Sequence, residues 1–162
     1  MDLFNILDSM SSLSSEEQTS KGASPVTGLK TDGTTVIGGK TILQWDQEWQ
    51  NIGRLKDACL TPYNHYVGLY RHVINGRTRY IGRAIELNNG GFRKRLSDYR
   101  RSSSSARTHS SGQLIYEHLD EIETYILVVG RTREAVETTE KLETAFIDYY
   151  KNREDLWNIQ GN

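Results

Sequence analysis

Two charged residues of this chain fall on helix faces that are otherwise apolar. Arg95 belongs to a predicted helix in which Phe92, Leu96 and Tyr99 recur at helical spacing, and it falls on their face. Glu143 falls inside the apolar arc of a later, longer helix. A charge in such a place must be paired or bound, because its desolvation is costly. A guanidinium binds phosphate oxygens and a carboxylate binds divalent cations, so phosphate chemistry is one interpretation of these two positions. The alternative is a structural ion pair between Arg95 and Glu143.

Two tyrosines accompany these charges on a predicted β-hairpin. The runs 67–70 and 79–82 are rich in β-branched and aromatic residues, and they flank Asn75-Gly76, a dipeptide that favours a tight turn. Alternate side chains of a strand share a face, so Tyr70 and Tyr80 are expected to project to the same side. The sequence therefore predicts a pair of phenols on one face of the hairpin.

A small α+β fold is expected to position these groups. After the hairpin the pattern predicts helices over about 91–101 and 113–118, a strand over 123–129 and a long helix over 132–151. This order predicts a three-stranded antiparallel sheet flanked by helices.

The N-terminal part has a different composition. Residues 1–40 are rich in Ser, Thr and Gly, which is typical of a flexible arm. Residues 41–62 predict a helical extension, because Trp45 and Trp49 belong to an apolar stripe with helical spacing. Residues 63–162 are expected to form the main domain.

Charge is strongly segregated along the chain. The formal net charge is -1, but the span 66–107 holds ten basic and two acidic residues, Glu86 and Asp98, which gives it a net charge of +8. Such a segment favours a polyanionic partner, although some of these cations are expected only to be solvated. The ten residues are Arg71, Arg77, Arg79, Arg83, Arg93, Lys94, Arg95, Arg100, Arg101 and Arg107.

Composition narrows the class of protein further. The hydrophobic fraction is 36% and the mean hydropathy is -0.64. No apolar run approaches the roughly 20 residues that cross a bilayer, so no membrane partner is expected. The first residues carry acids and no basic region, and Cys59 is the only cysteine. We therefore expect a cytoplasmic location by default and no internal disulfide.

The motif residues resemble those of the GIY-YIG nuclease family. Gly68-Leu69-Tyr70 and Tyr80-Ile81-Gly82 match the two halves of its motif, with Leu69 in the usual isoleucine place. The family carries, in chain order, two tyrosines, a helical arginine, a glutamate on a later helix and an asparagine near the end. The residues here that match this order, together with a tyrosine four residues after the arginine, are Tyr70, Tyr80, Arg95, Tyr99, Glu143 and Asn158.

The resemblance implies a metal-dependent DNA endonuclease that leaves 5′-phosphate and 3′-hydroxyl ends. Glu143 would hold one divalent metal, Mg²⁺ with Mn²⁺ as a substitute, and Arg95 would contact the scissile phosphate. Tyr70 is the preferred general base, although the sequence does not separate its role from those of the other tyrosines. The residues expected to contact DNA are Arg83, Arg93, Lys94, Arg100, Arg101, Arg107 and His109, with His72 as a further candidate.

Several biological roles fit these residues. A restriction-type enzyme is plausible, and a homodimer or higher oligomer through the N-terminal extension would supply two active sites. A DNA repair nuclease, a mobile-element nuclease or a toxin-type effector would use the same catalytic groups. The non-enzymatic alternative is a catalytically silent DNA-binding module of the same fold.

Overall fold

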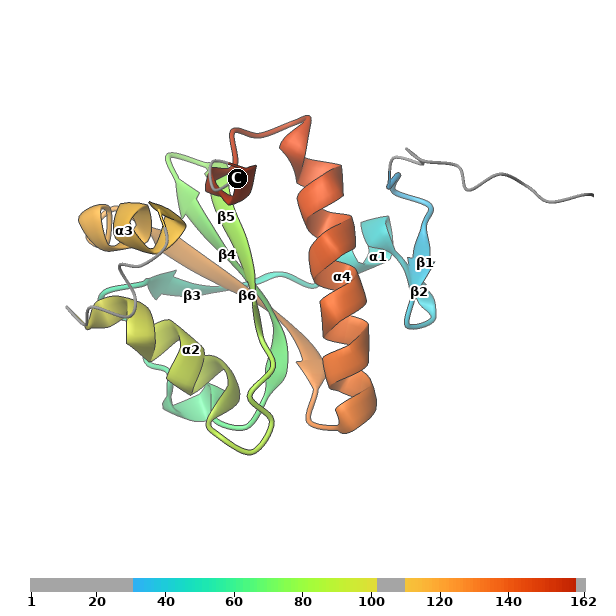
Figure 1. Cartoon of the computed structure of the whole chain (residues 1–162), viewed down its shortest axis with the longest axis horizontal. Helices are drawn as coiled ribbons and strands as arrows, with labels where there is room; N and C mark the ends of the chain where they lie inside the picture. Colours follow the sequence, from blue (N-terminus) through green and yellow to red (C-terminus); the bar gives the residue numbers. More distant parts are fainter. Residues whose placement is uncertain (1–30, 102–109, 160–162) are drawn as a thin grey trace, which may run out of the picture.

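The computed structural model describes residues 31–101 and 110–159 of the chain. A four-stranded antiparallel sheet with the order β3-β6-β4-β5 forms its centre (Figure 1). The strands are β3 (Gln50–Arg54), β4 (Val67–Ile74), β5 (Arg77–Ala84) and β6 (Glu123–Gly130). The fold is therefore α+β, as predicted from the order of the elements.

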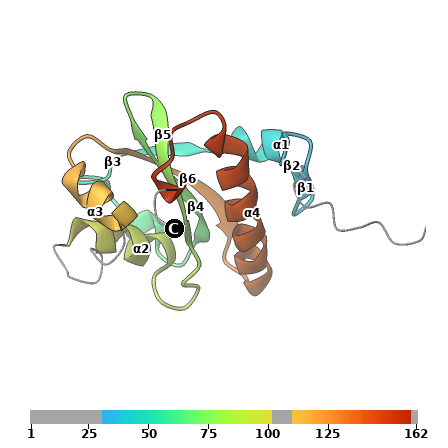
Figure 2. The ribbon, with the colours of Figure 1, turned by 45° about the horizontal axis from the view of Figure 1, so that its top comes forward.

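Helices cover both faces of this sheet (Figures 1 and 2). One face is covered by α2 (Gly91–Arg100) and α3 (Ser110–Glu117), and the other by α4 (Arg133–Lys151). Two short 3₁₀ turns complete this part, η1 (Thr61–Tyr63) and η2 (Trp157–Ile159). Within the described ranges, no helix is long and apolar enough to cross a membrane.

The β4–β5 hairpin lies where the sequence predicted it. Asn75 and Gly76 adopt φ angles of 51° and 75°, as the tight turn requires. Strand β4 lies between β5 and β6 in the sheet. Because helices cover both faces of the sheet, alternate side chains of β4 enter two different cores. Tyr70 packs on the α2 side with Phe92, whereas Leu69 packs on the α4 side.

The prediction of a three-stranded sheet is wrong, because the N-terminal extension supplies a fourth strand. Only Ile42–Asp46 of the extension forms an α-helix, α1, which begins with a capping box between Thr41 and Gln44. Residues Gln50–Arg54 instead form β3, which pairs with β6. The free edge of β6 binds this backbone, and Gly53 at φ 94° is unsuited to a helix. These long-range hydrogen bonds override the local helical spacing.

The two tryptophans of the extension pack within the chain. Trp45 is 5% exposed and its indole N–H donates to the carbonyl of Ile37 at 2.8 Å. The ring of Trp49 lies edge-on to Phe146 at 5.5 Å. Trp45 is therefore part of the core of this chain and Trp49 packs against that core, while an oligomer through the N-terminal extension stays a prediction.

The predicted N-terminal arm contains a short hairpin near its end. Strands β1 (Val36–Ile37) and β2 (Lys40–Thr41) form a two-stranded ladder of their own. Gly38 and Gly39 make its turn with φ angles of 58° and 82°. Residues 1–30 lie outside the described ranges, and the domain boundaries at 40 and 62 stay predictions.

Candidate active site

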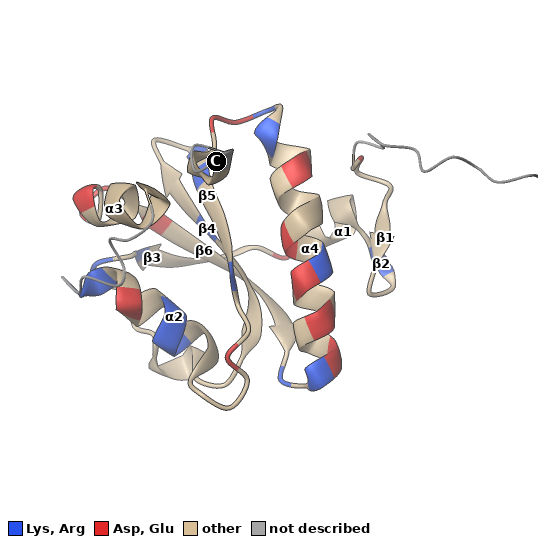
Figure 3. Ribbon diagram, viewed as in Figure 1, with Lys and Arg blue, Asp and Glu red and all other residues tan. Residues whose placement is uncertain are grey.

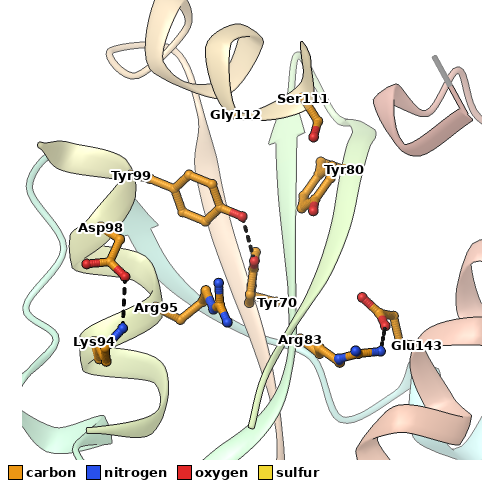
Figure 4. A pocket seen from close by; sticks show the side chains of 10 residues that line it. All are labelled: Tyr70, Tyr80, Arg83, Lys94, Arg95, Asp98, Tyr99, Ser111, Gly112 and Glu143. Carbon is orange, nitrogen blue, oxygen red and sulfur yellow. Dashed lines mark hydrogen bonds and ion pairs between the residues drawn. The ribbon is translucent and has the colours of Figure 1, made fainter. Parts of the chain in front are cut away.

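An open cavity of about 670 Å³ lies beside the edge strand β5. Side chains from β4, β5, α2, α3 and α4 surround it, so segments far apart in the sequence meet there (Figure 4). Its lining consists of Tyr70, Tyr80, Arg83, Lys94, Arg95, Asp98, Tyr99, Ser111, Gly112 and Glu143. Five of the six residues predicted as catalytic line this one cavity, and Asn158 does not.

Three phenols form a cluster on the α2 side of the hairpin. The hydroxyl oxygens of Tyr70 and Tyr99 are 2.6 Å apart, and the rings of Tyr70 and Tyr80 are 6.2 Å apart. Burial raises the pKa of all three phenols above the ordinary value. For Tyr80, hydrogen bonds with Tyr99 and Ser111 oppose this effect of burial on the pKa. The phenols are therefore protonated hydrogen-bond donors at neutral pH.

These pKa directions bear on the expected general base. A tyrosine acts as a general base only as its phenolate, and the phenolate is scarce near neutral pH unless the pKa of the phenol is lowered. Tyr70 is only 2% exposed, burial raises its pKa, and Arg95 opposes this only as the weakest influence. The cavity alone therefore does not activate Tyr70 as a base.

Two motif glycines make room for this arrangement. A Cβ at Gly82 would lie 2.4 Å from the ring and hydroxyl of Tyr70, which crosses the neighbouring strand at that point. A Cβ at Gly68 would lie 2.0 Å from the carbonyl oxygen of Leu127 on β6. The glycines on either side of the tyrosines thus allow the sheet to close around a buried phenol.

Arg95 projects from α2 toward the phenols (Figure 4). Its guanidinium forms an ion pair with Glu86, which lies in the loop between β5 and α2. Its Nε is buried and has no hydrogen-bond partner among the described residues. Arg93, two residues earlier, is exposed and is not part of the lining.

Glu143 reaches the cavity from the opposite side of the sheet. Its side chain is 18% exposed, and one carboxylate oxygen accepts a hydrogen bond from Arg83 at 2.6 Å. The alternative of an Arg95–Glu143 ion pair is wrong, because each residue pairs with a different partner. The two charges instead line one cavity with their own counter-charges.

The side chain of Asn158 forms two hydrogen bonds with the backbone of the Tyr80-Ile81-Gly82 segment. Its side-chain oxygen accepts from the N–H of Ile81 at 2.9 Å, and its amide donates to the carbonyl of Ile81 at 2.6 Å. This pair of bonds fixes the outer edge of β5 next to Tyr80. Asn158 therefore supports the edge strand and is not part of the cavity lining, and its predicted catalytic role stays a prediction.

Lys and Arg residues occur on α2 and β5 (Figure 3), but the predicted DNA contacts there differ in their availability. Arg83 and Lys94 line the cavity, and Arg93 and Arg101 are exposed. Arg100 donates to the carbonyls of Leu55 and Ala58, so it holds the chain after β3. Arg107 and His109 lie outside the described ranges.

Two other residues of the basic segment are unsuited to binding DNA. Arg71 lies among the rings of Trp49, Tyr125 and Tyr150 on the α4 side. His72 is 0% exposed, and burial lowers its pKa to about 3. The suggestion that His72 contacts DNA is therefore wrong.

The sequence interpretation did not assign three residues of the cavity lining, Asp98, Ser111 and Gly112, nor Glu86, which pairs with Arg95 outside the lining. Ser111 and Gly112 belong to α3, and nothing in their local pattern distinguishes them. Glu86 and Asp98, in contrast, carried a signal, since they are the two acids within the basic segment 66–107. Each pairs with a cavity cation, Glu86 with Arg95 and Asp98 with Lys94.

Comparison with known proteins assigns neither a family nor a function to this chain. No protein-family model, no curated protein and no solved structure matches the chain.

Proposed function

We propose that this protein is a metal-dependent DNA endonuclease that leaves 5′-phosphate and 3′-hydroxyl ends. The observation that carries the proposal is the cavity in which three phenols, Arg95 and Glu143 meet. The resemblance of the motif residues to the GIY-YIG family supports the same activity. Arg83, Lys94 and Arg95 line the cavity and give it cations suited to a polyanionic substrate.

Arg95 is the group that binds the scissile phosphate. Its guanidinium carries N–H donors in a planar fork that matches phosphate oxygens. Charge accumulates on these oxygens as water attacks phosphorus, and a fixed cation stabilises the transition state more than the ground state. The open side of the cavity admits the DNA backbone.

The phenols orient the reacting oxygens. Tyr70 and Tyr99 are hydrogen-bonded to each other, so together they present a fixed donor to water or phosphate. Tyr80 and Tyr99 are partly buried, whereas Tyr70 is buried. Only the deprotonated form of a phenol can accept a proton from water. A tyrosine here could serve as the base only if nearby positive charge lowered its pKa.

Glu143 is the residue that fits a divalent cation. Its carboxylate is a hard oxygen ligand that lines the cavity, as Mg²⁺ or Mn²⁺ prefers. The described residues contain no group of three or more His, Cys, Asp or Glu able to hold a metal, so substrate oxygens and water would complete its ligands. Mg²⁺, when bound, supplies positive charge that neutralises the phosphodiester and the departing 3′ oxygen.

Digestion of a long defined DNA by the purified chain tests this proposal. Cleavage is expected with Mg²⁺ and none with a chelator, and end labelling should find phosphate at the 5′ ends. Discrete fragments would indicate a recognition site, as restriction requires, and a smear would indicate unspecific cutting. DNA that is bound but stays intact with Mg²⁺ and with Mn²⁺ would contradict the proposal and favour a silent DNA-binding module.

A further inference from the structure

The carboxylate of Glu86 is held on both of its oxygens. One oxygen accepts from Nη2 of Arg95, and the other accepts from the N–H of Ile85 at 3.0 Å. The carbonyl of Glu86 also accepts from the N–H groups of Asn89 and Gly91, at 3.1 and 3.0 Å. The side chain is 18% exposed, so the loop between β5 and α2 fixes this carboxylate in place.

The ion pair with Glu86 restrains the guanidinium of Arg95. Its side chain is 39% exposed at the cavity, and its Nε has no hydrogen-bond partner within the described ranges. A long side chain with an unfixed guanidinium loses rotamer freedom when it binds a ligand. An anion held at one edge of the guanidinium removes part of that cost before the ligand arrives.

We propose that Glu86 is a positioning residue for Arg95. It binds one edge of the guanidinium and so aims the remaining N–H donors at the phosphodiester. Glu86 does not line the cavity, and it acts on the reaction only through Arg95. This inference rests on the proposed function, since it assigns Arg95 to the phosphate.

The alternative is that Glu86 competes with phosphate for Arg95. The two roles predict opposite effects, because removal of a competitor strengthens substrate binding, whereas removal of a support slows turnover. Geometry favours the support, since Glu86 keeps its bonds to Ile85, Asn89 and Gly91 and need not leave when a ligand binds.

Kinetics of Glu86→Ala and Glu86→Gln distinguish these roles. We expect kcat of Glu86→Ala to fall roughly 10- to 100-fold with little change in KM, as misplaced catalytic groups do. Glu86→Gln keeps an oxygen that accepts from Arg95, and it should restore most of the lost kcat. Asn88→Ala, an exposed change in the same loop, is the matched control and should cut as wild type does.

A second measurement does not depend on cleavage. In ¹⁵N NMR spectra of the free protein, the Nη resonances of Arg95, assigned with Arg95→Lys, should be separate in wild type and averaged in Glu86→Ala. Averaged resonances in wild type, or a Glu86→Ala enzyme that cuts as well as wild type or better, would overturn the positioning role. Wild-type protein that cuts no DNA while its Arg95 resonances stay separate would instead contradict the proposed function, and the catalytic role of Glu86 would fall with it.

Discussion

Glu143 on α4 and Arg83 on the edge strand β5 form an ion pair with a 2.6 Å contact at the rim of the cavity. Arg83 thus binds one oxygen of the same Glu143 carboxylate that we propose as the ligand of the metal. Arg83 therefore competes with a divalent cation for Glu143 while it also offers a cation to DNA. The competition with the metal and the attraction of DNA can be measured separately in variants of Arg83.

Arg83→Ala should lower the Mg²⁺ concentration needed for half-maximal cleavage. The pair is partly exposed, so its loss is expected to change that concentration by about two- to fivefold. DNA binding should weaken at the same time, because a cation leaves the cavity. A Mg²⁺ titration of plasmid cleavage measures the first effect and a gel shift the second.

Arg79→Ala is the matched control for this change. Arg79 lies on the same strand and pairs with Asp155 at 2.9 Å, away from the cavity lining. Its removal should leave the Mg²⁺ requirement unchanged. A higher Mg²⁺ requirement in Arg83→Ala would contradict the competition between Arg83 and the metal.

The buried phenols should make stability depend on alkaline pH. The pKa of Tyr70 is raised in the folded state, so the folded chain keeps a proton that the unfolded chain loses near the ordinary pKa of about 10. The stabilisation is therefore fully present below about pH 10, and it declines as the pH rises toward the folded-state pKa.

Urea unfolding of wild type and Tyr70→Phe above about pH 10 measures this contribution. Tyr70 accounts for about 1.4 kcal/mol of lost stability per pH unit, so the slope in Tyr70→Phe should be smaller by about that amount. Equal slopes in the two proteins would show that Tyr70 titrates normally and is not buried as described.

Asn158→Ala should reduce stability and leave the chemistry intact. The variant leaves the N–H and carbonyl of Ile81 without their side-chain partner, which costs about 1–3 kcal/mol. Asn152→Ala, an exposed change at the end of α4, serves as the control. A large fall in kcat of fully folded Asn158→Ala would contradict a purely structural role for Asn158 and favour its predicted catalytic role.

Local pattern was sufficient to predict the hairpin, the order of the later elements and the charges that face the cavity. Arg95 and Glu143 were found because each interrupts an apolar stripe, and a helical projection needs no knowledge of the tertiary fold. The hairpin was found because Asn75-Gly76 specifies its turn chemically.

Features that depend on long-range contacts were missed. Residues 50–54 form strand β3 and not the predicted helix because they hydrogen-bond to β6, which is far along the chain. The pairing of Glu143 with Arg83 in place of Arg95 depends on how α4 crosses the sheet. Neither the partner of a charge nor the edge of a sheet is visible in periodicity alone.

Cleavage of supercoiled plasmid by wild type, Glu143→Gln and Glu140→Gln tests the central claim most directly. Glu140 is exposed on the same helix and is not part of the cavity lining. With Mg²⁺, Glu143→Gln should cut at least about 100- to 1,000-fold more slowly while it still shifts DNA in a gel, and Glu140→Gln should match wild type. A Glu143→Gln protein that cuts plasmid at the wild-type rate would contradict the account.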